Sequence, residues 1–295
     1  MVYTSIVAGL TAALCWGTAD YLSRSQSEKV GYYKTVVYSH IVTLAVLVVL
    51  VPVVSPSLEV STFPVLALVA AGALNFVAFI FLYRAFHRGV VSVVAPVAYT
   101  YPAVTTVLSI AILGTFLSSA RILAIAGIIV GVILLSTRFS ELGAYLRGSG
   151  APNLTAGIGS AVGSSFFFGV VYIAIGYAAP LVSVVVPAMV LRAVGTVAGF
   201  LLAPILHQKV GPSRLAFSRT ILAMGVLEAA GFLSFTYGIA ATGGSLPVVA
   251  ALSGMGGAVA ASYGLIFLKE RLELNQFAGV LLSLLGVFVL LYLGG

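Results

Sequence analysis

The chain has 295 residues, of which 61% are hydrophobic and only 7% are charged. A soluble domain carries about 25% charged residues and cannot bury so much apolar surface in one core, so the composition excludes a soluble globular fold. The net charge of +7 comes from basic residues in short loops, so we expect the lipid bilayer, and no nucleic acid, as a partner.

Ten apolar segments follow one another along the chain, separated by short connectors that contain glycine or proline. Each has about 20 residues, which at 1.5 Å per residue crosses the roughly 30 Å of hydrocarbon in a bilayer. The first segment has no basic region before it, so we interpret it as a retained helix and not as a signal peptide. The predicted spans are residues 2–22, 33–53, 63–86, 90–113, 119–137, 154–177, 181–206, 219–241, 243–267 and 274–293.

The two halves of the chain resemble each other. The longest connector, residues 138–153, separates a first repeat (1–145) from a second repeat (153–295), each with five predicted spans. Because five is an odd number, two tandem copies must cross the membrane in opposite orientations, an architecture typical of secondary transporters. We therefore predict an all-α integral membrane protein of ten transmembrane helices, built as two inverted five-helix repeats. A shift of 155 residues pairs Gly89 with Gly244, Ala95 with Ala250, Leu117 with Leu272, Ala124 with Gly279 and Gly131 with Gly286, and a shift of 152 pairs Trp16-Gly17 with Phe168-Gly169 and His40 with Arg192.

The basic residues predict the orientation of these spans. Of the 14 Lys and Arg residues, Arg192 lies inside a span and Arg121 lies on the side of the termini. The positive-inside rule places the side that holds the others in the cytoplasm, so we expect both termini outside a cytoplasmic membrane. The others are Arg24, Lys29, Lys34, Arg84, Arg88, Arg138, Arg147, Lys209, Arg214, Arg219, Lys269 and Arg271.

Two stretches of sequence resemble the EamA-like branch of the drug/metabolite transporter superfamily. The run Cys15-Trp16-Gly17-Thr18 is similar to the Trp-Gly start of that family. Leu268-Lys269-Glu270-Arg271-Leu272, followed by Gln276, Gly279 and Gly286, is similar to its Glu-Arg-Leu loop and glycine-spaced helix. The resemblance implies a ten-helix carrier, and efflux or exchange more than uptake, but it says almost nothing about the solute. The first repeat departs from the pattern, since Thr115-Phe116-Leu117 stands where Glu-Arg-Leu often occurs.

Two ionisable residues lie deep inside predicted spans, where a charge costs about 2.5–3.5 kcal/mol on insertion scales. Arg192, in the seventh span, is either a clamp for a carboxylate or phosphate or one half of an ion pair that holds helices together. Glu228, in the eighth span, either exchanges a proton or binds a solute amine, or it is the fixed partner of Arg192.

Two further titratable residues are candidates for coupling transport to protons. His40 titrates near neutral pH in water, which suits a proton relay, although a hydrogen bond to neighbouring backbone is the plainer interpretation. Asp20 lies four residues before Arg24, so a surface pair between them is expected more than a coupling role.

Several uncharged residues can complete a solute cavity between the repeats. We predict Asn75, Trp16, Tyr99, Tyr101 and Tyr237 as binding residues, because solute pockets combine apolar faces with a polar edge. Packing is the alternative role for each of them.

The fourth and ninth spans contain residues that bend or interrupt helices. Pro96 and Pro102 each remove a backbone hydrogen bond, and Gly254, Gly256 and Gly257 follow Ser253 in the ninth span. The small residues of the fifth and tenth spans predict that these two helices pack together, away from the solute path.

Other classes of function find no support in the residues. Cys15 is the single cysteine, and the three histidines (His40, His87 and His207) lack metal-ligand spacing. The sequence has no Gly-rich phosphate loop and no nucleophile–base pair, so we predict no cofactor, no metal and no enzyme.

We predict a secondary carrier, monomeric or homodimeric, that moves a small polar metabolite, such as an amino acid or a related zwitterion, by alternating access. The proton is the candidate coupling ion, and the alternative function is a channel-like or lipid-handling membrane protein without a coupled cycle.

Overall fold

The computed structural model describes residues 2–55, 58–89, 94, 97–137, 139–148, 157–211, 218–240, 246–268 and 273–293, and these residues form helices without a strand. Five helices, α2, α3, α8, α9 and α10, are long and apolar enough to cross a membrane by length and composition. The helices are α1 (Val2–Val30), α2 (Tyr32–Val54), α3 (Thr62–Arg88), α5 (Tyr101–Leu113), α6 (Ser119–Ser136), α7 (Phe139–Leu146), α8 (Ile158–Ala178), α9 (Val185–Ile205), α10 (Arg219–Ala240), α11 (Leu246–Ser253), α12 (Gly256–Leu268) and α13 (Leu274–Tyr292).

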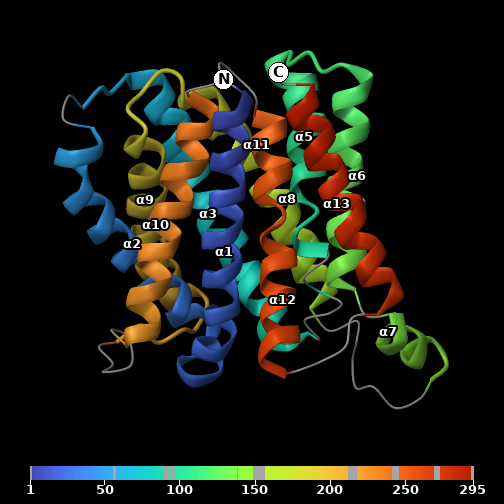
Figure 1. The fold of residues 1–295 in the computed structure, drawn as a ribbon. Coiled ribbons are helices and arrows are strands. Elements are labelled where there is room, and N and C mark those ends of the chain that lie inside the picture. The colour runs from blue at the N-terminus through green and yellow to red at the C-terminus, as the bar shows by residue number, and fades with distance from the viewer. Residues whose placement is uncertain are drawn as a thin grey trace.

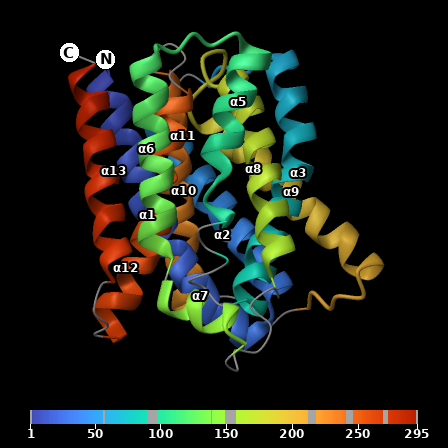
Figure 2. The same cartoon turned by 90° about the vertical axis from the view of Figure 1, so that its right-hand side faces the viewer.

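The long helices run side by side along one axis and form a bundle (Figures 1 and 2). Both termini lie at one end of the bundle and α7, between the two repeats, lies at the other end (Figure 1). The second repeat therefore starts at the end opposite to the first, which confirms the predicted ten-helix fold of two inverted repeats. The fourth span ends with α5, and the ninth span consists of α11 and α12.

The first helix is longer than predicted. Instead of ending near residue 22, α1 continues to Val30, and Gly31 then takes a positive φ of 88° that lets the chain turn directly into α2. An ion pair between Arg24 and Glu28, four residues apart, stabilises the added turns. The expected pair between Asp20 and Arg24 is therefore wrong, because Arg24 contacts Glu28.

The connector between the repeats is also partly helical, where the sequence predicted only a linker. Helix α7 begins at Phe139, and its first turn is held by Glu273, whose carboxylate accepts hydrogen bonds from the backbone N–H and the hydroxyl of Ser140. A carboxylate at a helix N-terminus satisfies N–H groups that have no partner inside the helix.

Helices α6 and α13 pack together as predicted. A Cβ atom on Gly131 would lie 2.8 Å from the backbone oxygen of Gly279, and one on Gly286 would lie 2.8 Å from that of Ala124. Neither position has room for a side chain, so the small residues bring the two backbones into contact. None of these residues lines the cavity described below.

Each of these two helices also supplies hydrogen bonds to the C-terminal carbonyls of the other. Near the start of α13, Asn275 donates to the carbonyls of Leu134 and Thr137, and Gln276 donates to that of Leu135. Near the start of α6, Arg121 donates to the carbonyl of Leu293. Carbonyls at a helix end lack partners within the helix, so these side chains satisfy them.

The fourth and ninth spans are interrupted at positions that contact each other. Tyr99 and Thr100 form a turn before α5, and a two-residue turn separates α11 from α12. The hydroxyl groups of Tyr101 and Ser253 lie 3.0 Å apart and join the two interruptions. Pro102 occupies the first turn of α5, where proline is tolerated, and Pro96 lies outside the described residues.

Candidate functional site

A partly open cavity lies between the helices, with about 400 Å³ of empty space when its open part is included. It is bounded by both repeats, since its lining residues come from α1, α3 and the fourth span in the first repeat and from α8 and α10 in the second. On α1, α8 and α10 the lining residues are four apart, so each pair lies on one face of its helix. The lining consists of Trp16, Asp20, Phe79, Leu82, Ala98, Tyr99, Tyr101, Phe168, Tyr172, Glu228 and Phe232.

The wall of the cavity is mainly aromatic. The Trp16 ring stacks on Tyr172 with a centroid distance of 6.0 Å, and its edge contacts Phe232 at 5.1 Å. Tyr101 packs against Tyr172 at 5.0 Å. Aromatic rings offer apolar contact to a solute. The faces of the rings also carry partial negative charge, which attracts a cation.

The carboxyl group of Asp20 belongs to this cavity and not to the membrane surface. Asp20 is 7% exposed, and it accepts a hydrogen bond from the hydroxyl of Tyr99. Asp20 and Glu228 both line this cavity. The structure therefore brings together two acidic groups, from α1 and α10, that the sequence had assigned to different environments.

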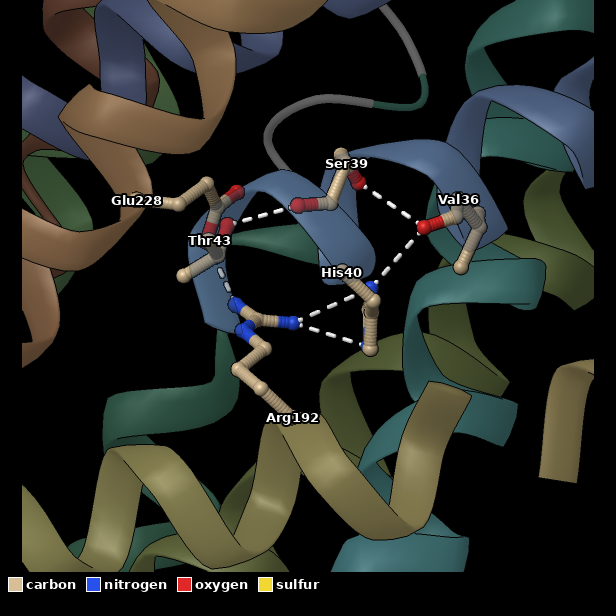
Figure 3. A network of polar contacts seen from close by, with 6 residues as sticks. All are labelled: Val36, Ser39, His40, Thr43, Arg192 and Glu228. Carbon is tan, nitrogen blue, oxygen red and sulfur yellow. Dashed lines mark hydrogen bonds and ion pairs between the residues drawn. The ribbon is translucent and has the colours of Figure 1, made fainter. Parts of the chain in front are cut away.

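Arg192, which is not a lining residue, forms a buried ion pair with the lining residue Glu228 (Figure 3). The guanidinium Nη2 lies 2.6 Å from Oε2 of Glu228, and the two residues are 1% and 2% exposed. The guanidinium carbon also lies 4.5 Å from the ring centroids of both Phe79 and Phe232. Of the two interpretations of Arg192, the ion pair between helices is the one that the structure contains.

His40 completes this network from α2 (Figure 3). Its Nδ1 lies 3.0 Å from the carbonyl oxygen of Val36, and its Nε2 lies 2.8 Å from Nη1 of Arg192. Because guanidinium can only donate, Nε2 accepts and Nδ1 carries the proton that is donated to Val36, which is the neutral tautomer. The hydrogen bond to neighbouring backbone is thus present, and the same ring also orients Arg192. Gly195 gives this ring room, since a Cβ there would lie 2.6 Å from it.

Charge is distributed unevenly around the cavity. Among the lining residues the structure describes, two are acidic and none is basic. Arg192 balances Glu228 from behind, and His40 is neutral in the tautomer above. Asp20 has a neutral hydroxyl as its hydrogen-bond partner and takes part in neither salt bridge of the described residues, so its carboxyl group has no basic partner among them.

The structure groups some of the predicted residues and separates others. Trp16, Tyr99 and Tyr101 line the cavity, together with Asp20 and Glu228. Tyr237 does not, because its side chain is 53% exposed on the outer face of α10. Asn75 is fully buried in α3 but is not part of the lining.

Four aromatic lining residues were missed, and the sequence contained a signal for three of them. Phe168 and Tyr172 follow Trp16 and Asp20 by 152 residues, so the repeat alignment pairs all four. Phe232 lies one helical turn after Glu228 and shares its face. Phe79 had no comparable signal.

Comparisons with known proteins agree with this architecture. The sequence model of the EamA-like transporter family matches residues 3–137 and 155–292, one match in each half of the chain. An uncharacterized protein of Methanocaldococcus jannaschii is 28% identical over 138 residues, which cover 45% of this chain and 96% of that protein.

A crystal structure of another protein has the same fold. It superposes with a TM-score of 0.73 over 97% of this chain and 95% of the other, at 19% identity, a level at which the likeness concerns the fold alone. Since the family match spans both repeats, the chain belongs to the EamA-like transporter family of the drug/metabolite transporter superfamily.

Proposed function

We propose that this protein is a secondary carrier for a small organic cation with an apolar body, which it binds in the central cavity and moves by alternating access. The observation that carries the proposal is the cavity lining, in which aromatic rings surround two carboxyl groups without a basic side chain among the described lining residues. A cation gains from both components, through charge pairing with carboxylate and through the faces of the rings.

An amino acid zwitterion, the solute class suggested by the sequence, is less well supported. Its carboxylate would need a basic partner, and Arg192, which pairs with the lining residue Glu228, is the candidate. That guanidinium is already engaged by Glu228, by His40 and by two phenylalanine rings. Releasing it would leave Glu228 buried without its cation, which is strongly unfavourable.

We propose that Asp20 alternates between the solute cation and a proton. A carboxyl group in a cavity of low polarity needs a positive partner or a proton once the solute has left. This alternation makes the carrier an exchanger of cations for protons. By the positive-inside rule we also propose that the end with α7 faces the cytoplasm and the termini face outward.

The test uses purified protein in liposomes and three probes that share a benzene ring but differ in charge. Benzyltrimethylammonium, phenylalanine and benzenesulfonate keep their charges at neutral pH and cross bilayers poorly. We expect labelled benzyltrimethylammonium to accumulate by counterflow in liposomes loaded with the unlabelled cation. In liposomes without internal cation, we expect its uptake to release protons that a pH dye detects. Counterflow also separates a carrier from a channel, which cannot produce it.

Two variants test whether transport of the cation depends on the cavity. Asp20→Asn keeps the size of the side chain but removes its charge, and we expect counterflow to be lost. Tyr237→Phe changes an exposed residue outside the cavity and is the matched control. Exchange of phenylalanine or benzenesulfonate, without exchange of the cation, would contradict the proposed solute class.

A further inference from the structure

Tyr99 lies where three elements of the cavity meet. Its backbone forms part of the turn that interrupts the fourth span, and its hydroxyl donates a hydrogen bond to Asp20 on α1. Its ring lies against the start of α12, where a Cβ atom on Gly257 would be 2.8 Å from the ring. The absence of a side chain at this position makes room for the ring.

Tyr101 offers a close comparison, because it is an equally buried tyrosine in the same wall. Tyr99 is 5% exposed and Tyr101 is 4% exposed, and both line the cavity. The hydroxyl of Tyr101 is paired with Ser253 and not with an acidic group. The two tyrosines therefore differ mainly in the partner of the hydroxyl group.

A hydroxyl that donates to a carboxylate partly satisfies the acceptor that a cationic solute would use. Hydrogen bonds to charged groups are among the stronger ones in proteins, so a solute must outcompete this bond to take Asp20 for itself. Once the bond is broken, Tyr99 no longer ties α1 to the interrupted fourth span.

We propose that Tyr99 is a positioning residue that competes with the solute for Asp20. The proposal rests on the proposed function, since it assumes that a cation binds at Asp20. The bound cation displaces the hydroxyl and loosens the junction between α1, the fourth span and α12. As the cation leaves, the hydroxyl returns to the Asp20 carboxylate before a proton binds there, and this favours release. Tyr99 thus weakens binding and accelerates turnover.

The test compares Tyr99→Phe with Tyr237→Phe, each of which removes only a hydroxyl group; Tyr237 is exposed and lies outside the cavity. The single tryptophan, Trp16, is part of the cavity wall, so its fluorescence reports binding of benzyltrimethylammonium without a label. For Tyr99→Phe we expect a Kd about tenfold lower than that of the wild type, as for loss of one competing hydrogen bond to a charged group. We also expect a lower KM and a lower maximal rate in counterflow. For Tyr237→Phe we expect a Kd within about threefold of the wild type, well under the tenfold that one such bond represents.

Other results would overturn the proposal in distinguishable ways. An unchanged or higher Kd in Tyr99→Phe, with normal binding by the wild type, would refute the competition but leave the proposed carrier function intact. If the wild type showed neither binding nor counterflow of the cation, both the competition by Tyr99 and the proposed carrier function would be refuted. Gly257→Ala is a second variant that keeps the hydroxyl group but displaces the ring. Tighter binding by this variant as well would support the proposal, and unchanged binding would contradict it.

Discussion

Replacing Arg192 by leucine tests the electrostatic account of the buried pair. The substitution removes the cation 2.6 Å from Glu228 and two ring contacts, while Glu228 stays about 2% exposed. A buried carboxylate without a partner avoids the cost of its charge by taking up a proton. The penalty of the substitution then includes the free energy of that protonation.

The magnitude follows from the pH. A carboxyl group that titrates near 4.3 in water requires about 3.7 kcal/mol for protonation at pH 7 and about 1 kcal/mol at pH 5. The lost ring contacts add roughly 1–2 kcal/mol at either pH. We therefore expect Arg192→Leu to lower the free energy of unfolding by about 5 kcal/mol at pH 7 and about 2 kcal/mol at pH 5. The sign follows from linkage, because a folded state that binds one more proton than the unfolded state gains stability as the pH falls.

Glu228→Leu is the matched control, because it breaks the same pair from the other side. Arginine does not release its proton in proteins, so the penalty in this variant is independent of pH. Unfolding is measured by titration with dodecyl sulfate in micelles of a mild detergent, followed by circular dichroism at both pH values. Equal destabilisation of Arg192→Leu at pH 5 and pH 7 would refute the reasoning, as would a matching pH dependence in Glu228→Leu.

Further predictions concern the packing of the bundle and the edge of the site. Gly131→Ala places a Cβ 2.4 Å from Oγ of Ser283, so we expect a loss of about 1–3 kcal/mol in unfolding free energy. Gly127→Ala on the same helix meets no atom nearer than 3.8 Å and should unfold like the wild type in the same titration. Asn275→Leu leaves two carbonyls of the neighbouring helix end without their donor and should cost about 1–3 kcal/mol in that assay. Tyr237→Phe should leave both Kd and counterflow unchanged, and a clear effect on either would contradict its placement outside the cavity.

The sequence predicted the architecture well because each apolar span must cross a membrane of nearly fixed thickness. The interruptions within the fourth and ninth spans were also signalled by residues, such as Pro102 and Gly254, that disturb helices. The extension of α1 and the short helix α7 were missed, because both depend on polar contacts at the membrane surface. Glu28 and Glu273 make these contacts, and hydropathy does not register them.

The site was harder to predict for a physical reason. In a membrane, the side of a helix that faces lipid is as apolar as the side that packs against protein, so sequence cannot tell which way an aromatic residue points. Tyr237 and Phe232 lie on the same helix, yet one is exposed and the other lines the cavity. Asp20 was misassigned because a partner four residues away is visible in sequence, whereas Tyr99, which is distant along the chain, is not.

The contact between His40 and Arg192 has a consequence for how such a protein can arise. These two residues occupy equivalent positions in the two repeats, 152 residues apart, and their side chains touch. In a symmetric dimer of identical single-repeat chains, both positions of this contact would hold the same residue. The contact would then join two guanidinium groups or two imidazole rings. Joining both copies in one polypeptide allows the two positions to mutate separately, so that a donor meets an acceptor. Only after such a fusion can the pseudo-symmetry axis carry a polar contact between unlike groups.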